Sequence, residues 1–294
     1  MPDHLYPPLR MCMYCGTTTL PSGVKRFTDE HIIPLALGGN LVLPEASCTE
    51  CAKIINKQIE TPVLFKEWGY LRIKRGFPSR KRKNKRDAQK TQVTLTRQDG
   101  RPMRIGVADY SCPVPLYKFK EARIFSGAPR GDDNFHWTMD ILTSHDDEMA
   151  MQTKFPEWNR QHAIMAQPYQ FARLLAKIGF SYAVAEYGLA GFTPLVTDPI
   201  LGRSDGYFDT VGGSLDVQDA IAGGDHLTTI KILVRDGNRA LLIVDIRLFS
   251  QIRTPSYHVV VGEIDFDNPA HASVFEKHRI ESKVHLLPLL AVTA

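Results

Sequence analysis

The sequence contains no run that approaches 18 uninterrupted apolar residues, so it offers no candidate for a membrane-spanning helix. Its first residues, Met-Pro-Asp-His, lack the basic and then apolar pattern of a secretory signal. It also lacks an internal repeat, a P-loop and a dinucleotide-binding fingerprint. From these absences we expect a soluble, cytoplasmic protein with no membrane partner, and neither a repeat protein nor a member of the common nucleotide-binding folds.

Cysteine is scarce. There are five among 294 residues, and four of them form the pairs Cys12-x-x-Cys15 and Cys48-x-x-Cys51. This usage fits metal binding in a reducing compartment better than disulfides. Two such pairs can hold one tetrahedral Zn²⁺ through four thiolates, so the sequence predicts a structural zinc site. Cys112 is left over and is expected to be a small buried or surface residue.

Charge is nearly balanced but unevenly placed. The formal net charge is +4, yet residues 1–100 carry 17 Lys and Arg against 9 Asp and Glu, and the remainder carries 19 against 23. This asymmetry suggests that the first third of the chain meets a polyanion. The length and the 43% apolar content are enough for a sizeable core and favour two domains.

Between the cysteine pairs lies the segment DEHIIPLALGGN, residues 29–40. Taken with the flanking pairs, it resembles the HNH endonucleases, whose ββα-metal fold is a hairpin followed by a helix with one divalent ion between them. The resemblance covers about residues 10–60. It implies a metal-dependent endonuclease that hydrolyses DNA phosphodiester bonds, with RNA as the alternative substrate. By analogy alone, such proteins act in phage defence or in mobile elements.

The resemblance also assigns roles within this segment. His31 is expected to be the general base, and an unperturbed imidazole with a pKa near ~6.5 suits that task. Asn40 is expected to orient the loop that carries His31. Glu30 is expected to bind the catalytic Mg²⁺, Mn²⁺ or Ni²⁺, with Asp29 as its rival. Because neighbours on a strand point to opposite faces, Glu30 and His31 share a site only if the backbone bends.

The chain departs from the family pattern after the last cysteine. Family members often place Asn or His there, and this chain has Ala52. Asn56 stands one helical turn later on the same face, so we expect it to be the second protein ligand of the catalytic ion, with Glu60 as the alternative. The departure leaves open a module that binds nucleic acid without cutting it.

A basic run occupies residues 72–90, and Trp68, Tyr70 and Phe77 lie beside or within it. Cations can neutralise phosphates while aromatic rings stack on exposed bases, and the alternative is a solvated tether. The residues predicted to contact nucleic acid are Lys53, Lys57, Arg72, Lys74, Arg75, Arg80, Lys81, Arg82, Lys83, Lys85 and Arg86.

The expected fold is α+β. Residues 1–68 form a zinc-clipped HNH ββα-metal module, residues 69–90 a basic linker, and residues 91–294 an α+β domain with an antiparallel sheet. Hydrophobic periodicity predicts strands at about 25–34, 40–43, 92–95, 104–107, 228–234, 240–246 and 257–264, and helices at about 49–66 and 169–187. Residues 44–47 should end the second strand, and Ser47 should cap the first helix. The last domain would supply target choice, a homodimer interface or a site for a regulatory partner. In the rival interpretation, the zinc module only binds nucleic acid and this domain is a sensor.

Overall fold

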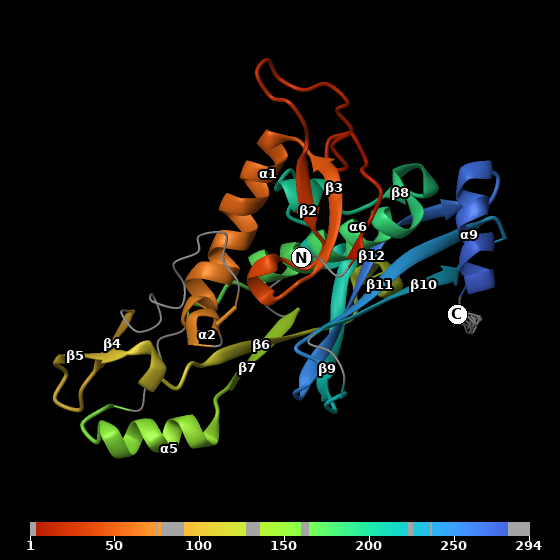
Figure 1. The fold of residues 1–294 in the computed structure, drawn as a ribbon. Coiled ribbons are helices and arrows are strands. Elements are labelled where there is room, and N and C mark those ends of the chain that lie inside the picture. Colours follow the sequence, from red (N-terminus) through yellow and green to blue (C-terminus); the bar gives the residue numbers. More distant parts are fainter. Residues whose placement is uncertain are drawn as a thin grey trace.

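A computed structural model describes residues 4–74, 76–77, 91–127, 136–159, 165–222, 226–235 and 237–281. The fold is mixed α+β, and the long helix α6 (Pro168–Tyr187) lies between the N-terminal elements and the strands of the C-terminal sheet (Figure 1). Within the described residues, no helix is both long enough and apolar enough to cross a membrane.

The N-terminal module, residues 4–68, begins with a three-stranded sheet in the order β1-β3-β2. The central strand β3 pairs in parallel with β1 and antiparallel with β2. The bounds of its elements are β1 His4–Leu5, β2 Thr28–His31, η1 Leu35–Leu37, β3 Leu41–Ser47, α1 Thr49–Ile55 and η2 Asn56–Glu67.

Strand β3 does not end at Pro44, contrary to our expectation. It runs through to Ser47 because the pairing with β2 shifts register between Thr28 and Glu30, and the resulting bulge absorbs the extra residues. Glu45 lies in this bulge with a φ of 50°, and its N–H donates to the Asp29 carboxylate at 3.2 Å. Proline, which has no N–H to offer, is tolerated at such an irregularity.

The predicted helix at 49–66 is confirmed, but its start differs from the prediction. Cys48 is the N-cap and its Sγ accepts from the N–H of Cys51, whereas the Ser47 hydroxyl donates to the carbonyl of Cys48. After α1 the helix continues as η2, a π-helix that contains Pro62. Its wider turn is seen in the N–H of Trp68, which donates to the carbonyl of Val63, five residues earlier.

A second group of elements flanks the basic run in the sequence. The predicted strands at 92–95 and 104–107 correspond to β4 and β5, which pair as an antiparallel hairpin. These strands and α5 enclose a small apolar core built around the fully buried Trp158. The bounds are α2 Gly69–Lys74, β4 Gln92–Thr96, β5 Pro102–Gly106, η3 Val107–Asp109 and α5 His145–Lys154.

The C-terminal part, residues 165–281, holds a five-stranded antiparallel sheet in the order β10-β11-β12-β8, with β9 also paired to β12. The predicted strands at 228–234, 240–246 and 257–264 lie within β10, β11 and β12. A two-stranded ribbon, β6 with β7, packs beside this sheet. The bounds are β6 Val114–Phe119, α4 Arg123–Ser126, β7 Trp137–Leu142, α6 Pro168–Tyr187, η5 Leu189–Gly191, β8 Thr193–Pro194, α7 Thr197–Leu201, α8 Tyr207–Thr210, β9 Val211–Gln218, β10 His226–Val234, β11 Arg239–Leu248, β12 Thr254–Asp265 and α9 Pro269–Glu281.

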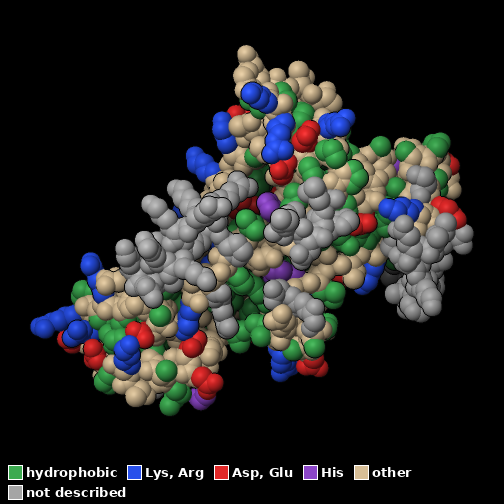
Figure 2. Space-filling model, in the orientation of Figure 1, with side chains coloured by type: hydrophobic (Ala, Val, Ile, Leu, Met, Phe, Trp, Pro, Cys, Tyr) green, Lys and Arg blue, Asp and Glu red, His purple; other side chains and the backbone are tan. Residues whose placement is uncertain are grey.

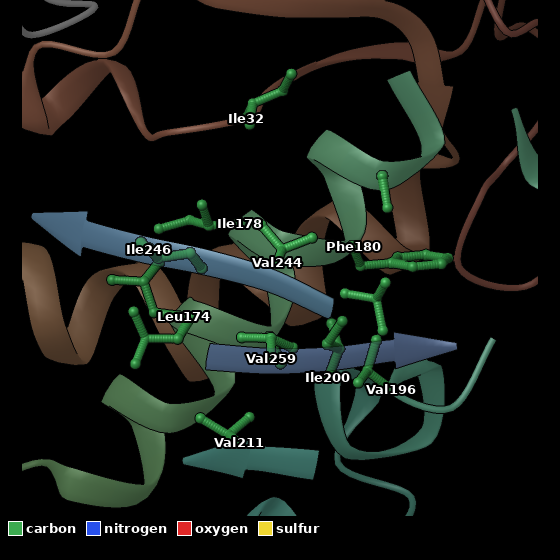
Figure 3. Close-up of a cluster of buried hydrophobic side chains, with 14 of the residues drawn as sticks. Ile32, Leu174, Ile178, Phe180, Val196, Ile200, Val211, Val244, Ile246 and Val259 are labelled. Atoms are coloured by element: carbon green, nitrogen blue, oxygen red, sulfur yellow. The ribbon is translucent and has the colours of Figure 1, made fainter. Parts of the chain in front are cut away.

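Helix α6 is largely apolar and is buried on nearly every side, as expected of a central helix. Gly179 lets it approach β12 closely, since a Cβ there would lie 3.1 Å from the Cβ of Val259. On its other side α6 contacts η2. The core is therefore continuous between the N-terminal module and the C-terminal sheet, and Ile32 belongs to the same buried cluster as Leu174 and Ile178 of α6 (Figure 3).

Candidate functional site

The four paired cysteines converge as predicted. The Sγ atoms of Cys12, Cys15, Cys48 and Cys51 all lie within 4.8 Å of one another, and those of Cys15 and Cys48 are 3.9 Å apart. Four sulfurs at ~2.3 Å around a tetrahedral zinc ion would be roughly 3.8 Å apart, so the spacing fits zinc. Burial, together with the neighbouring Cys12 and Cys48 thiols, raises the pKa of Cys51, so its thiolate needs a cation beside it.

The backbone of the segment between the cysteine pairs turns in a way that requires glycine at positions 38 and 39. After β2 the chain buries Ile32 and Ile33, turns at Pro34, and forms the short helix η1. Gly38 ends η1 with a left-handed φ of 86°, and its N–H donates to the carbonyl of Leu35. A Cβ on Gly39 would lie 2.0 Å from the carbonyl oxygen of Ile33, so only glycine fits there. We call residues 31–39 the His31 loop.

Three side chains from other elements hold carbonyl groups of the His31 loop. Arg72 of α2 donates through Nε to the carbonyl of Ala36 at 2.7 Å. His226 of β10 contacts the carbonyl of Leu37 through Nε2 at 2.8 Å, and its Nδ1 accepts from a backbone N–H, which fixes Nε2 as the donor. Lys177 of α6 donates to the carbonyls of His31 and Ile32. The loop is therefore anchored by residues far along the chain.

Lys177 also binds two carboxylates of the N-terminal module. Its Nζ lies 2.5 Å from Oε1 of Glu30 and 3.6 Å from Oε1 of Glu60. The side chain of Lys177 is fully buried, that of Glu30 is 9% exposed and that of Glu60 is 26% exposed. Glu30 and Glu60, from β2 and η2, thus converge on one buried ammonium.

The charges of Lys177 and Glu30 depend on burial and on the charged groups beside them. Burial lowers the pKa of Lys177, but the carboxylates of Glu30 and Glu60 outweigh that effect and raise it above its ordinary value. Burial raises the pKa of Glu30, and the ammonium of Lys177 opposes this shift. Lys177 is therefore the group that keeps its charge, because an opposite charge stands next to it.

The predicted catalytic residues occupy different surroundings. His31 ends β2 and is half-buried, and it follows Glu30 on a strand whose side chains alternate between faces. Asn40 is exposed, directly before β3. Asn56 is exposed at the end of α1, and its Oδ1 accepts from the hydroxyl of Thr61 at 3.0 Å. In the part of the chain that the structure describes, only the four cysteines bring three or more His, Cys, Asp or Glu ligand atoms together.

Asp29, the alternative to Glu30 as a metal ligand, has a role in the local fold. Its Oδ1 accepts from the N–H of Glu45 in the β3 bulge, and its Oδ2 pairs with Arg26 at 3.4 Å. This carboxylate therefore stabilises the bulge that sets the β2–β3 register.

The predicted nucleic-acid contacts divide into three groups. Lys53 and Lys57 are exposed on the first helix, and Lys53 pairs with Glu50 at 2.8 Å. Arg72 is buried, and Lys74 is bound to the carbonyl of Tyr110 and to an acidic side chain of α5, so both serve the fold. The remaining predicted contacts, Arg75, Arg80, Lys81, Arg82, Lys83, Lys85 and Arg86, lie outside the described residues. Lys and Arg side chains gather over the part of the surface that carries α1, β2 and β3 (Figure 2).

Sequence reasoning missed Lys177 and His226. A signal for Lys177 was present, because it lies within a largely apolar helix, and a buried lysine requires acidic or carbonyl partners. No local pattern marks His226, whose contact with Leu37 depends on how β10 meets the His31 loop.

Comparison with known protein families identifies a similarity in the N-terminal module. A family model described as HNH endonuclease matches residues 12–66, which is the stretch from the first paired cysteine to the end of the helix. No curated protein and no solved structure matches the chain.

Proposed function

Residues 12–66 form an HNH endonuclease domain, and on that premise we propose that the protein is a metal-dependent endonuclease that hydrolyses DNA phosphodiester bonds. The observation that carries the proposal is the anchored His31 loop between the four cysteines. Arg72, Lys177 and His226 fix the carbonyls of this loop. A catalytic base needs such fixed placement, because small displacements of the reacting groups strongly lower the reaction rate.

In this proposal His31 is the general base. Its half-buried ring would accept the proton of the attacking water, and a neutral imidazole can do so at physiological pH. Asn40 would orient the end of the loop through its amide. A divalent ion (Mg²⁺, Mn²⁺ or Ni²⁺), when bound, would stabilise the charge that develops on the phosphate.

Glu30 is the proposed first ligand of that ion, and the second is Asn56 or Glu60. Hard oxygen donors of this kind suit Mg²⁺ and Mn²⁺. Two contacts favour Glu60. Its carboxylate converges with that of Glu30 on Lys177, whereas the amide of Asn56 accepts from Thr61.

DNA is the proposed substrate, with RNA as the alternative. Lys53 and Lys57 would contact phosphates from the exposed side of the first helix. The basic run at residues 75–90 would add further phosphate contacts. We further propose that residues 91–294 supply target choice, a homodimer interface or the site of a regulatory partner, and that the protein acts in the cytoplasm, in phage defence or in a mobile element.

A second candidate function is nucleic-acid binding without cleavage, with the C-terminal part as a sensor. Two observations favour it. Ala52 replaces the usual family ligand, and Glu30 is engaged by Lys177.

Supercoiled plasmid incubated with the purified protein and Mg²⁺ or Mn²⁺ separates the two functions. The nuclease gives nicked or linear DNA, and chelation of the divalent ion abolishes the products while zinc stays bound. Retardation of the DNA without any cleavage, in Mg²⁺, Mn²⁺ and Ni²⁺ alike, would instead support the binding module.

A further inference from the structure

We infer that Lys177 is a positioning residue of the nuclease centre, whose ammonium occupies the cation position on Glu30 and so makes divalent-ion binding depend on helix α6. The inference rests on the proposed function, since it takes Glu30 to be a ligand of the catalytic ion. It goes further in giving the C-terminal part a physical means of controlling that ion.

The first step is the nature of the contacts. The ammonium of Lys177 contacts four oxygen groups, namely the carboxylates of Glu30 and Glu60 and the carbonyls of His31 and Ile32. A divalent ion of the Mg²⁺ class prefers the same donor types. Lys177 thus holds the donors that the ion would need.

The second step is charge. When Glu30 and Glu60 are both ionised, the two carboxylates and the ammonium together carry one net negative charge. A divalent ion placed on Glu30 while Lys177 stays beside it would face a like charge at short range in a buried region, where charges are weakly screened. The ion and the ammonium therefore compete for Glu30. Because Glu60 lies close to Lys177, its carboxylate can pair with the ammonium when the ion binds Glu30.

The third step is the mechanical link to the C-terminal sheet. Lys177 lies on α6 two residues before Gly179, which packs directly against Val259 and Val261 of β12. The Ser181 hydroxyl donates to the carbonyl of Lys177 and fixes the same turn. The reach of the ammonium toward Glu30 is therefore set by how α6 lies on β12. A partner that shifts this packing would change the occupancy of Glu30 without touching the His31 loop.

The test is a titration of the full-length, zinc-loaded protein with Mn²⁺ in the absence of DNA, followed by the electron paramagnetic resonance signal of unbound Mn²⁺. Lys177→Met should bind Mn²⁺ at least about tenfold more tightly than the native protein, because the competing charge is gone. Lys177→Arg, which keeps the charge, should bind it as weakly as the native protein. In Lys177→Met combined with Glu30→Gln the gain should disappear, because the ligand itself is lost.

Zinc content and circular dichroism show whether each variant is folded. If Lys177→Met does not fold, Lys177→Gln, which retains a hydrogen-bond donor, takes its place with the same expected gain. The inference is overturned if a folded neutral variant binds Mn²⁺ with native affinity, or if the gain survives Glu30→Gln. It is equally overturned if both neutral variants lose the zinc-bound fold while Lys177→Arg keeps it, since Lys177 is then only structural. Tighter Mn²⁺ binding by Lys177→Met in a protein that never cleaves DNA would refute the nuclease proposal and leave the competition for Glu30 intact.

Discussion

The ammonium of Lys177 on α6 lies 2.5 Å from the carboxylate of Glu30 on β2, and both side chains are buried. Removing one member of a buried ion pair typically costs about 3–5 kcal/mol, because the other charge is left without compensation. The contact therefore stabilises one particular placement of the N-terminal module on α6. A residue of the C-terminal part is built into the surroundings of the predicted metal ligand.

Zinc should be present at about one ion per chain in the purified protein and should leave only when the N-terminal module unfolds. Cys15→Ser should reduce the zinc content and lower the melting temperature, since a hydroxyl is a poor replacement for a thiolate ligand. Cys112→Ser is the matched control, because Cys112 lies outside the cluster and should leave the zinc content unchanged. Metal analysis that finds no zinc while the four paired thiols react in the native state would contradict the structural zinc site.

His31→Ala should lower the rate of plasmid cleavage by roughly two to four orders of magnitude, the usual contribution of a positioned general base. Zinc content and DNA affinity should stay at native levels, because the predicted zinc ligands are the four thiolates and the predicted phosphate contacts are lysines and arginines elsewhere. His145→Ala is the matched control, since that histidine is exposed at the start of α5. Native cleavage by His31→Ala would exclude His31 as the base.

The sequence was sufficient for the parts of the molecule that depend on local pattern. Paired cysteines predicted the four-thiol cluster. Alternation and helical spacing predicted β10, β11 and β12 of the main sheet and helix α6, but not β8 and β9. The β3 bulge was missed because proline usually ends a strand, and here the shifted register and the Asp29 contact to Glu45 accommodate it.

Contacts between distant segments could not be predicted in the same way. Arg72 reads as one more cation of a basic run, yet it is buried and donates to the carbonyls of Ala36 and Leu64. The pairing of Lys177 with Glu30 depends on how α6 crosses the N-terminal module, and one sequence does not encode that placement in any local pattern. The catalytic ligand set and the domain boundaries stay predictions for the same reason.

Stability should fall with rising pH through the titration of Glu67. Burial raises the pKa of Glu67 from 4.5 to about 7, against the lowering effect of the hydrogen bond from Tyr117. Because the folded-state pKa is the higher one, the stabilising contribution is full below the unfolded pKa and is lost as pH rises through about 7. Glu67→Gln mimics the neutral acid, so its melting temperature should fall less than the native one between about pH 5 and about pH 8.

The difference in free energy of unfolding between native protein and Glu67→Gln should change by roughly 3 kcal/mol across this pH range. Glu50→Gln is the control, because Glu50 is exposed and should leave the pH profile unchanged. Parallel profiles for the native protein and Glu67→Gln would show that Glu67 does not titrate in this range.

DNA affinity should depend on salt through the basic run. Replacing Arg80, Lys81, Arg82, Lys83, Lys85 and Arg86 together by Ala should weaken binding and flatten its salt dependence, since each lost phosphate contact removes roughly one unit from the log–log slope. Arg203→Ala, at an exposed arginine of the C-terminal part, serves as the control for a general loss of charge. An unchanged slope in the sixfold variant, measured by fluorescence anisotropy at several salt concentrations, would identify the run as a tether.

A fragment of residues 1–68 should bind zinc yet melt without the sharp transition of the full chain. Its cysteine cluster is complete, but Ile32 and Ile59 would lose the core that they share with α6, and Glu30 would lose its ammonium. Burying a carboxylate without a partner is unfavourable, so the His31 loop should exchange its amide hydrogens much faster in the fragment than in the full chain. Hydrogen exchange measured on both proteins tests this directly, with amides next to the four cysteines as the internal reference. Equal protection of the His31 loop in fragment and full chain would show that the N-terminal module is an independent domain, and that α6 contributes nothing to the order of this loop.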